Sequence, residues 1–360
     1  MKNFSAHIDT IADRLKIKDD VCPAIAYQMA KHCGADVSRI EELRDALEKS
    51  PDVQKLLQTG AQVMQRLNFN TVHGSTNIHL ENVLPMLLDR GLDVSFNSFG
   101  HTFSALCQSF DQPLFADTHC FRMLIPIILA PLLLWAGYRN ERLLDFYKKR
   151  LVLVSDFCAR MDYDIYGPQG DYGGIPKPFQ DRKVINPALY PNGAFHFPLL
   201  HDLYAYRAMY PEAAPEERAR IDAVLKYVLS PDYQDFPKGY GLLREGSGHY
   251  YAMGWDCKLP RNKGVITAPI LHRMELLAAF PPAVRSEWFQ AHLDMLMQCA
   301  GEDGMFDLPK KALGEKESYW ISGGHMGLGE NRWAKDALRA LGSFRVFRIF
   351  SNIAHCGGMR

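Results

Sequence analysis

The sequence predicts an all-α protein in which helix hairpins close into an α/α toroid, and two observations predict it. Apolar residues recur with helical spacing along most of the chain, whereas runs that alternate apolar and polar residues are scarce. Glycines beside aromatic residues recur roughly every 65 to 70 residues, with about two helices in each interval. A lone helix pair cannot bury its apolar stripe, so the about five or six pairs that fit in the chain must share a core.

Residues that start helices mark several of the predicted segments. Pro215 followed by Glu216 and Glu217 suits a first helical turn, and Ser286 offers an N-cap to the segment after it. Strand signals are weak, and short strands are expected only around residues 240–256. The periodicity predicts helices over residues 51–68, 78–90, 140–161, 198–210, 215–229, 268–280, 287–300 and 331–353.

The recurrent glycine–aromatic turns favour closure of the helix pairs into a ring. Glycine adopts a positive φ at little cost, and an aromatic side chain can fill the gap between neighbouring helices. The spacing of the turns also exceeds the about 34 to 47 residues of open helical arrays. We therefore expect one toroidal domain over residues 1–360, in which residues 1–50 could form an N-terminal helical extension. The glycines that define the repeat are Gly100, Gly170, Gly239 and Gly304.

The composition indicates which classes of partner the net charge does not attract and in which compartment the protein is expected. The 41 Lys and Arg residues equal the 41 Asp and Glu residues, so net charge attracts neither nucleic acid nor an anionic membrane. The 8 cysteines are widely and irregularly spaced, which is typical of free thiols in apolar surroundings. Residues 1–20 lack the apolar core of a signal peptide, so we expect a cytoplasmic protein.

One uncharged segment has to be compared with a membrane span. Residues 123–138 contain no charged side chain, but these 16 residues fall short of the about 20 that cross a bilayer. Pro126 and Pro131 also interrupt the segment. We predict a buried, kinked helix and no transmembrane segment, and a shallow contact with a membrane surface is the alternative.

The last predicted helix is rich in basic residues. Arg332, Lys335, Arg339, Arg345 and Arg348 stand against a single acidic residue within this stretch. We interpret them as a solvated helix face, and a stripe that faces a phosphate or pyrophosphate is the alternative.

The segment from Trp288 to Phe306 resembles a degenerate QW repeat. In that motif a helix ends with glutamine and is followed by Gly-x-aromatic, as Gln298 and Gly304 are placed here. The repeat is found in the squalene and terpenoid cyclases, whose α/α toroids are related to the β subunits of protein prenyltransferases. The resemblance implies a central pocket lined by aromatic side chains and an isoprenoid-like substrate.

The acidic and metal-binding motifs of these families are incomplete in this chain. The Asp-x-Asp-Asp acid motif of the cyclases is reduced to Asp162 and Asp164. The prenyltransferase subunits bind zinc through Asp-x-Cys and a histidine some sixty residues later. The resemblance implies a similar Zn²⁺ site at Asp256, Cys257 and His325, although the first two residues are adjacent here.

The densest group of polar and aromatic residues lies between residues 239 and 260. Histidine, tyrosine and carboxylates together can transfer protons, and the glycines of this segment let backbone approach a ligand closely. The alternative is a long loop between helices whose aromatic residues fill gaps. The candidate catalytic residues are Arg244, Glu245, His249, Tyr250, Tyr251 and Asp256. We interpret the other histidines, among them His73, His79, His101, His119, His196 and His201, as ordinary polar or core residues.

Three functions remain open on the sequence alone. The resemblance favours an enzyme that takes an isoprenoid-like or other hydrophobic small molecule into a toroid pocket. The candidate residues between 239 and 260 equally suit a carbohydrate-active lyase or hydrolase on the same fold. A non-catalytic helical binding scaffold is the third. A toroid hosts many unrelated reactions, so the fold does not choose among them.

Overall fold

The computed structural model describes residues 4–17, 21–111, 124–261 and 263–357. Within this part of the chain the fold is mostly helical, with seventeen α-helices and one sheet of two strands. This confirms the all-α prediction. The chain divides into two compact units, one formed by Met1–Ala105 with Pro260–Arg360 and the other by Leu106–Leu259. A single domain and closure of the helices into a ring stay predictions.

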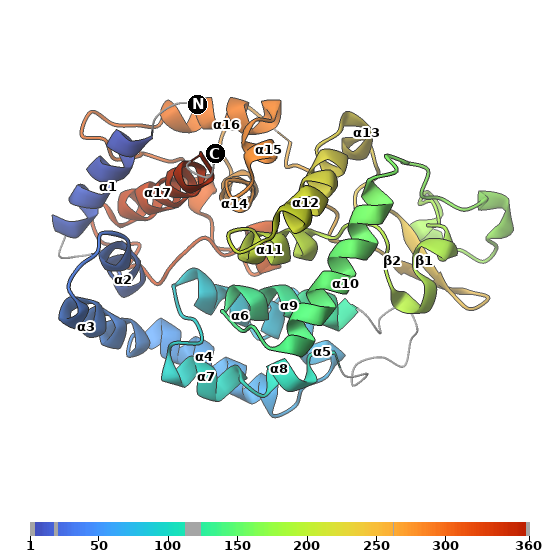
Figure 1. Ribbon diagram of the computed structural model, residues 1–360, viewed down its shortest axis with the longest axis horizontal. Helices are drawn as coiled ribbons and strands as arrows, with labels where there is room; N and C mark the ends of the chain where they lie inside the picture. Colours follow the sequence, from blue (N-terminus) through green and yellow to red (C-terminus); the bar gives the residue numbers. More distant parts are fainter. Residues whose placement is uncertain (1–3, 18–20, 112–123, 262, 358–360) are drawn as a thin grey trace. The chain divides into compact units, whose positions relative to one another are not determined.

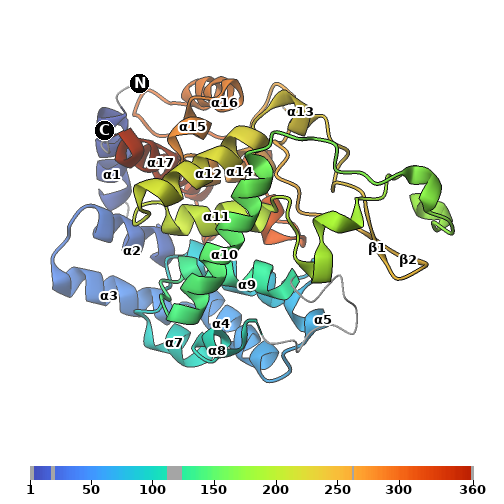
Figure 2. The ribbon, with the colours of Figure 1, turned by 45° about the vertical axis from the view of Figure 1, so that its right-hand side comes forward.

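The first unit joins the beginning and the end of the chain. Helix α1 packs against α17 and lies beside it in both views (Figure 1 and Figure 2), and α4 packs against α6 and α7. The helices before residue 50 therefore belong to this unit, because α1 packs against α17 and α3 packs against α4. The helices of this unit are α1 (Ser5–Ile17), α2 (Pro23–His32), α3 (Val37–Glu48), α4 (Pro51–Met64), α5 (Phe69–Val72), α6 (Leu80–Asp89), α7 (Asn97–Phe103), α14 (Ala268–Leu277), α15 (Pro281–Val284), α16 (Glu287–Met297) and α17 (Ala337–Gly357).

A buried network of charges ties three helices of the first unit together. Arg345 of α17 has a relative exposure of 0% and forms ion pairs with Asp89 of α6 at 2.7 Å and with Glu275 of α14 at 3.1 Å. Arg348 adds a second cation, 2.6 Å from Asp89. The two arginines hold the pKa of Asp89 well below its usual range, against the opposing effect of burial. A buried charge is tolerated only when it is paired in this way.

The interpretation of the last helix as a solvated basic face is therefore wrong at its C-terminal half. Arg345 and Arg348 point to buried carboxylates of neighbouring helices. The helix has no solvated face at these positions, because its other residues there are also buried. The helix also begins at Ala337, six residues later than the predicted start at residue 331. Arg332 lies before the helix and pairs with Glu330 at 2.8 Å.

In the second unit, each long helix packs against another that is next but one to it in the sequence. Helix α9 packs against α11, and α10 packs against α12, and the latter two lie side by side in both views (Figure 1 and Figure 2). The elements of this unit are α8 (Leu106–Ser109), α9 (Leu124–Trp135), α10 (Glu141–Cys158), α11 (Leu200–Met209), α12 (Pro215–Val228), α13 (Pro231–Gln234), β1 (Leu242–Glu245) and β2 (His249–Ala252).

Helix α9 is the uncharged segment that the sequence singles out. Residues 124–134 are all buried, which confirms a buried helix. The helix is continuous through Pro131, and the predicted kink stays a prediction. Met123, at the start of the predicted segment, lies outside the described residues. No described helix is both long enough and apolar enough to cross a membrane.

The predicted glycine turns are only partly observed. Gly239 and Gly304 do follow helices and have φ values of 73° and 79°. Gly170 lies in a short 3-10 turn. The prediction is wrong at Gly100, which lies inside α7 and makes helical hydrogen bonds at both its amide and its carbonyl group. An aromatic-flanked glycine does not by itself terminate a helix that the surrounding residues stabilise.

Candidate functional site

The segment between residues 239 and 260 forms a β-hairpin, in agreement with the short strands predicted there. In the register of β1 and β2, Arg244 lies opposite Tyr250 and Glu245 lies opposite His249. Successive residues of a strand point to opposite faces of a sheet. Arg244 and Tyr250 therefore share one face, and Glu245 and His249 share the other with Tyr251. The hairpin divides five of the candidate catalytic residues between its two faces.

The face that carries Tyr250 is mostly structural. Tyr250 is buried with Leu242 and Val184, and its hydroxyl group donates a hydrogen bond of 2.8 Å to the carbonyl oxygen of Gly173. The guanidinium group of Arg244 lies over the ring of Tyr172, at 5.4 Å from the ring centroid. These contacts anchor the hairpin to the loop around residue 173. On the other face His249 is exposed and Glu245 is half-buried.

Asp256 holds the turn that follows the hairpin. Its carboxylate accepts hydrogen bonds from the backbone amides of Gly239 at 2.6 Å and Lys258 at 2.9 Å. The two aromatic residues next to Gly239 and Asp256 have a left-handed backbone conformation. The φ value is 60° at Tyr240 and 57° at Trp255. Such conformations are costly for aromatic residues and persist only where the surroundings fix them. Both carboxylate oxygens of Asp256 are thus used in fixing the backbone.

The three predicted zinc ligands are buried or form hydrogen bonds with other protein groups. Cys257 is 1% exposed, and its backbone amide donates to the hydroxyl group of Tyr233 at 2.8 Å. His325 is buried, and its Nε2 donates to the carbonyl oxygen of Ser318 at 2.7 Å. Among the described residues, no group of three or more His, Cys, Asp or Glu side chains could hold a metal ion. The zinc site at Asp256, Cys257 and His325 stays a prediction.

A histidine–carboxylate pair lies in the first unit, at the start of α6. The Nδ1 atom of His73 lies 3.0 Å from both carboxylate oxygens of Glu81. Glu81 is buried, and it also accepts a hydrogen bond from the backbone amide of Gly74 at 3.2 Å. Burial raises the pKa of Glu81, whereas the hydrogen bond and charge of His73 act in the opposite direction. A carboxylate in this position fixes the tautomer and the orientation of the imidazole ring.

Aromatic residues of a distant segment cover this pair. The ring of Tyr319 stacks on the ring of His73, with centroids 5.5 Å apart and an angle of 18° between the planes. The next residue, Trp320, meets the ring of His272 edge-on at 4.5 Å. Burial and the nearby Glu81 raise the pKa of Tyr319, so its hydroxyl group keeps its proton at neutral pH.

Asn82 positions the two segments that form this group. Its side-chain nitrogen donates to the carbonyl oxygens of Gly74 and Thr76, both at 2.8 Å. Its side-chain oxygen accepts the backbone amide of Trp320 at 2.8 Å. One fully buried amide group therefore ties the loop that carries His73 to the segment that carries Tyr319. We refer to His73, Glu81, Asn82 and Tyr319 together as the His73 cluster.

No chemical role for His73 is predicted from the sequence, because its partners are distant in sequence or lie in an apolar helix. The residues of α6 are all buried, so its Glu81 and Asn82 are polar residues in a helix without a solvated face. A buried carboxylate needs a partner. The acidic residue next to Asn82 in the otherwise apolar segment 80–88 is the signal that could have directed attention here.

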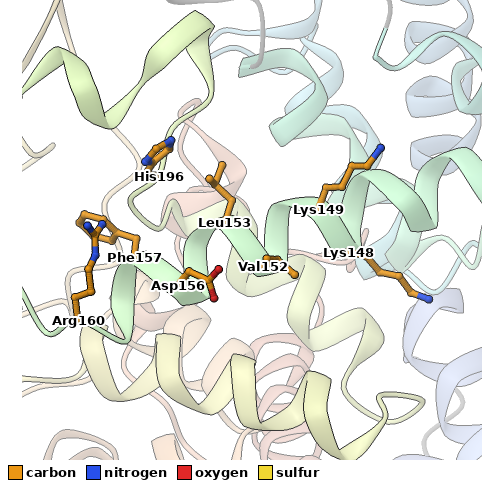
Figure 3. Close-up of a pocket in the computed structure, with 8 residues that line it drawn as sticks. All are labelled: Lys148, Lys149, Val152, Leu153, Asp156, Phe157, Arg160 and His196. Carbon is orange, nitrogen blue, oxygen red and sulfur yellow. The ribbon is translucent and has the colours of Figure 1, made fainter.

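An open groove lies along α10 in the second unit (Figure 3). Its volume is about 660 Å³, within the range of small-molecule sites. Lys148 and Lys149 lie at one end and Arg160 at the other, and Leu153 points to the same side of the helix as His196. Burial, with Arg150 and Arg160 nearby, lowers the pKa of His196, so this imidazole is neutral at neutral pH.

Comparison with known proteins identifies no relative. No protein-family model matches the chain, no curated protein matches it, and no solved structure matches it. The resemblance to the terpenoid cyclases and prenyltransferases stays a prediction from the sequence between Trp288 and Phe306.

Proposed function

We propose that this protein is an enzyme that transfers protons to and from a small molecule at the His73 cluster. The observation that carries the proposal is the pair formed by the half-buried His73 and the buried Glu81, with the imidazole Nδ1 atom 3.0 Å from the carboxylate. A carboxylate beside Nδ1 fixes the tautomer and the orientation of an imidazole ring, as it does in histidines that act as general bases. The stacked Tyr319 supplies a phenol that can act as an acid.

The chemistry of these groups favours elimination over two-carboxylate hydrolysis. Glycoside hydrolysis uses two carboxylates on either side of the bond that breaks, whereas here the carboxylate of Glu81 is already bound to His73. In an elimination, His73 takes a proton from carbon and the electron pair of that bond forms a carbon–carbon double bond. The neighbouring carbon–oxygen bond breaks, and the departing oxygen takes the proton of Tyr319. We therefore propose a lyase acting on an oxygenated small molecule, such as an oligosaccharide.

This proposal develops the carbohydrate-active alternative on residues other than those first expected. The isoprenoid-like substrate remains an alternative proposal, but the aromatic residues around Gly239 support it poorly. Tyr233 and Tyr240 are buried, and their hydroxyl groups are hydrogen-bonded to each other, so these rings fill the unit instead of lining a pocket.

The toroid and the cytoplasmic location remain part of the proposal. The packing of α9 on α11 and of α10 on α12 supports the toroid, because stacked helix pairs place every second helix side by side. Free thiols are typical of a reducing compartment, and they are observed at Cys22, Cys33, Cys107, Cys158, Cys257 and Cys299.

Exchange of a carbon-bound proton with solvent tests the proposed base directly. We would incubate the wild-type protein with oligosaccharides in deuterated water and measure deuterium uptake and unsaturated products by mass spectrometry. Loss of the base should lower both signals about a hundredfold or more in His73→Gln. His101→Gln, in the exposed part of α7, is the matched control and should react like wild type. Equal rates in the two variants would exclude His73 as the base.

A further inference from the structure

We propose that the groove along α10 binds an anionic amphiphile, a small molecule with an acidic head group and a hydrocarbon body. This site is distinct from the His73 cluster and does not depend on the function proposed there. The groove is open, and its lining combines exposed cations with apolar side chains of the same helix (Figure 3).

Apolar side chains of α10 are exposed to solvent in the groove, where polar side chains are usual on a helix surface. Val152 is 41% exposed, and the half-buried Leu153 and the buried Phe157 continue the lining toward the C-terminal end of α10. Leu153 and Phe157 are four residues apart and follow one side of the helix, and Val152 lies about 100° around the helix from Leu153. A hydrocarbon chain laid along this side would remove the exposed surface of Val152 and Leu153 from water.

The charges at the groove favour an anion. Lys148 and Arg160 form no ion pair with any residue that the structure describes, whereas Lys149 is paired with Asp145 at 2.8 Å. Asp156, the one acidic residue among the described residues of the lining, forms an ion pair with Arg220 at 2.8 Å. The groove thus keeps unpaired positive charge at both ends. Charge complementarity of this kind selects the sign of a ligand.

The end of the groove at Arg160 is the better site for the head group. Arg160 lies over the ring of Phe157, at 5.1 Å from its centroid, which restrains the guanidinium group. His196 belongs to the same lining and, as a neutral imidazole, can donate or accept one hydrogen bond. Arg160 lies two residues beyond the end of α10, and the ten residues from Lys148 to that end span about 15 Å along the helix axis. A head group at Arg160 therefore leaves room for an extended hydrocarbon body.

Calorimetric titration of the full chain with three ligands of equal length tests the proposal. Decanoate and decyl phosphate carry an acidic head group, and decanol is the neutral counterpart. We expect both anions, or the one whose head group is the natural one, to bind at least about tenfold more tightly than decanol. Comparison of the two anions distinguishes a carboxylate from a phosphate ligand. Equal affinity for decanol, or no binding of either anion, would overturn the proposal.

Charge variants locate the binding in the groove. Arg160→Gln should weaken binding of the preferred anion about fivefold, and Lys148→Gln should weaken it less. Both side chains are exposed, so both variants should keep the wild-type melting temperature. Lys226→Gln, on the exposed side of α12, is the matched control and should leave the affinity unchanged. An equal loss in Lys226→Gln and Arg160→Gln would mean that the anion is attracted nonspecifically and would overturn the site.

Discussion

The His73 cluster and the hairpin between residues 239 and 260 both concentrate groups that can transfer protons, but they hold them differently. The hairpin has more such residues, but Tyr250 and His249 are successive strand residues and lie on opposite faces of it. The His73 cluster has fewer, but the ring of His73 contacts both the carboxylate of Glu81 and the ring of Tyr319, and Asn82 binds the backbone next to Tyr319. Convergence of side chains, and not their density in the sequence, distinguishes the better candidate site.

Removal of the amide group of Asn82 should have the largest effect on this comparison. Asn82→Ala leaves the amide of Trp320 and the carbonyl oxygens of Gly74 and Thr76 without their partner. We expect the free energy of unfolding to fall by about 3 kcal/mol or more. Urea denaturation would measure it. Asn77→Ala, at an exposed position of the same loop, should change the value by less than about 0.5 kcal/mol, and a similar loss in both variants would argue against the role of Asn82.

The two faces of the hairpin should respond unequally to substitution. Tyr250→Phe removes the hydrogen bond to Gly173 and should cost about 1 kcal/mol in the free energy of unfolding. His249→Gln, on the exposed side, should change it by less than about 0.5 kcal/mol. Thermal and urea denaturation of both variants would check the difference. A large loss in His249→Gln would show that His249 is held by contacts as strong as those of Tyr250.

The dependence of stability on pH should identify Glu81 as a carboxyl group with a raised pKa. In the folded state its pKa lies above the ordinary value of 4.5, because burial disfavours the charged form. Its contribution is therefore fully present below the pKa of the unfolded chain and is lost as pH rises through the folded pKa. The free energy of unfolding of wild type, relative to Glu81→Gln, should decrease as pH rises from about 4 toward neutrality. A relative stability that increases over this range would contradict the raised pKa.

Local signals in the sequence predicted much of the fold. The N-cap at Ser286 is observed, with its side chain accepting the amide of Phe289, and Pro215 opens α12 as expected. The strands around residues 240–256 are also observed. These features depend on neighbours in the chain, which helix periodicity and capping residues describe well.

Interactions between distant segments were not predictable in the same way. Arg345 is read as a surface residue from its charge alone, but it is paired with Asp89 and Glu275, which lie on other helices. The hydrogen bond between the side chain of Asn82 and the backbone amide of Trp320 joins residues that are 238 positions apart in the sequence. No local pattern specifies which buried carboxylate meets which cation or histidine, so the His73 cluster emerged only from the three-dimensional arrangement.

The most direct test compares the two candidate bases, His73 and His249, in one assay. We would measure kcat/KM of His73→Gln and His249→Gln on the substrate that shows proton exchange with the wild-type protein. The account predicts a loss of about a hundredfold or more in His73→Gln and a wild-type rate in His249→Gln. The opposite result, with the loss confined to His249→Gln, would place the chemistry at the hairpin and contradict the account.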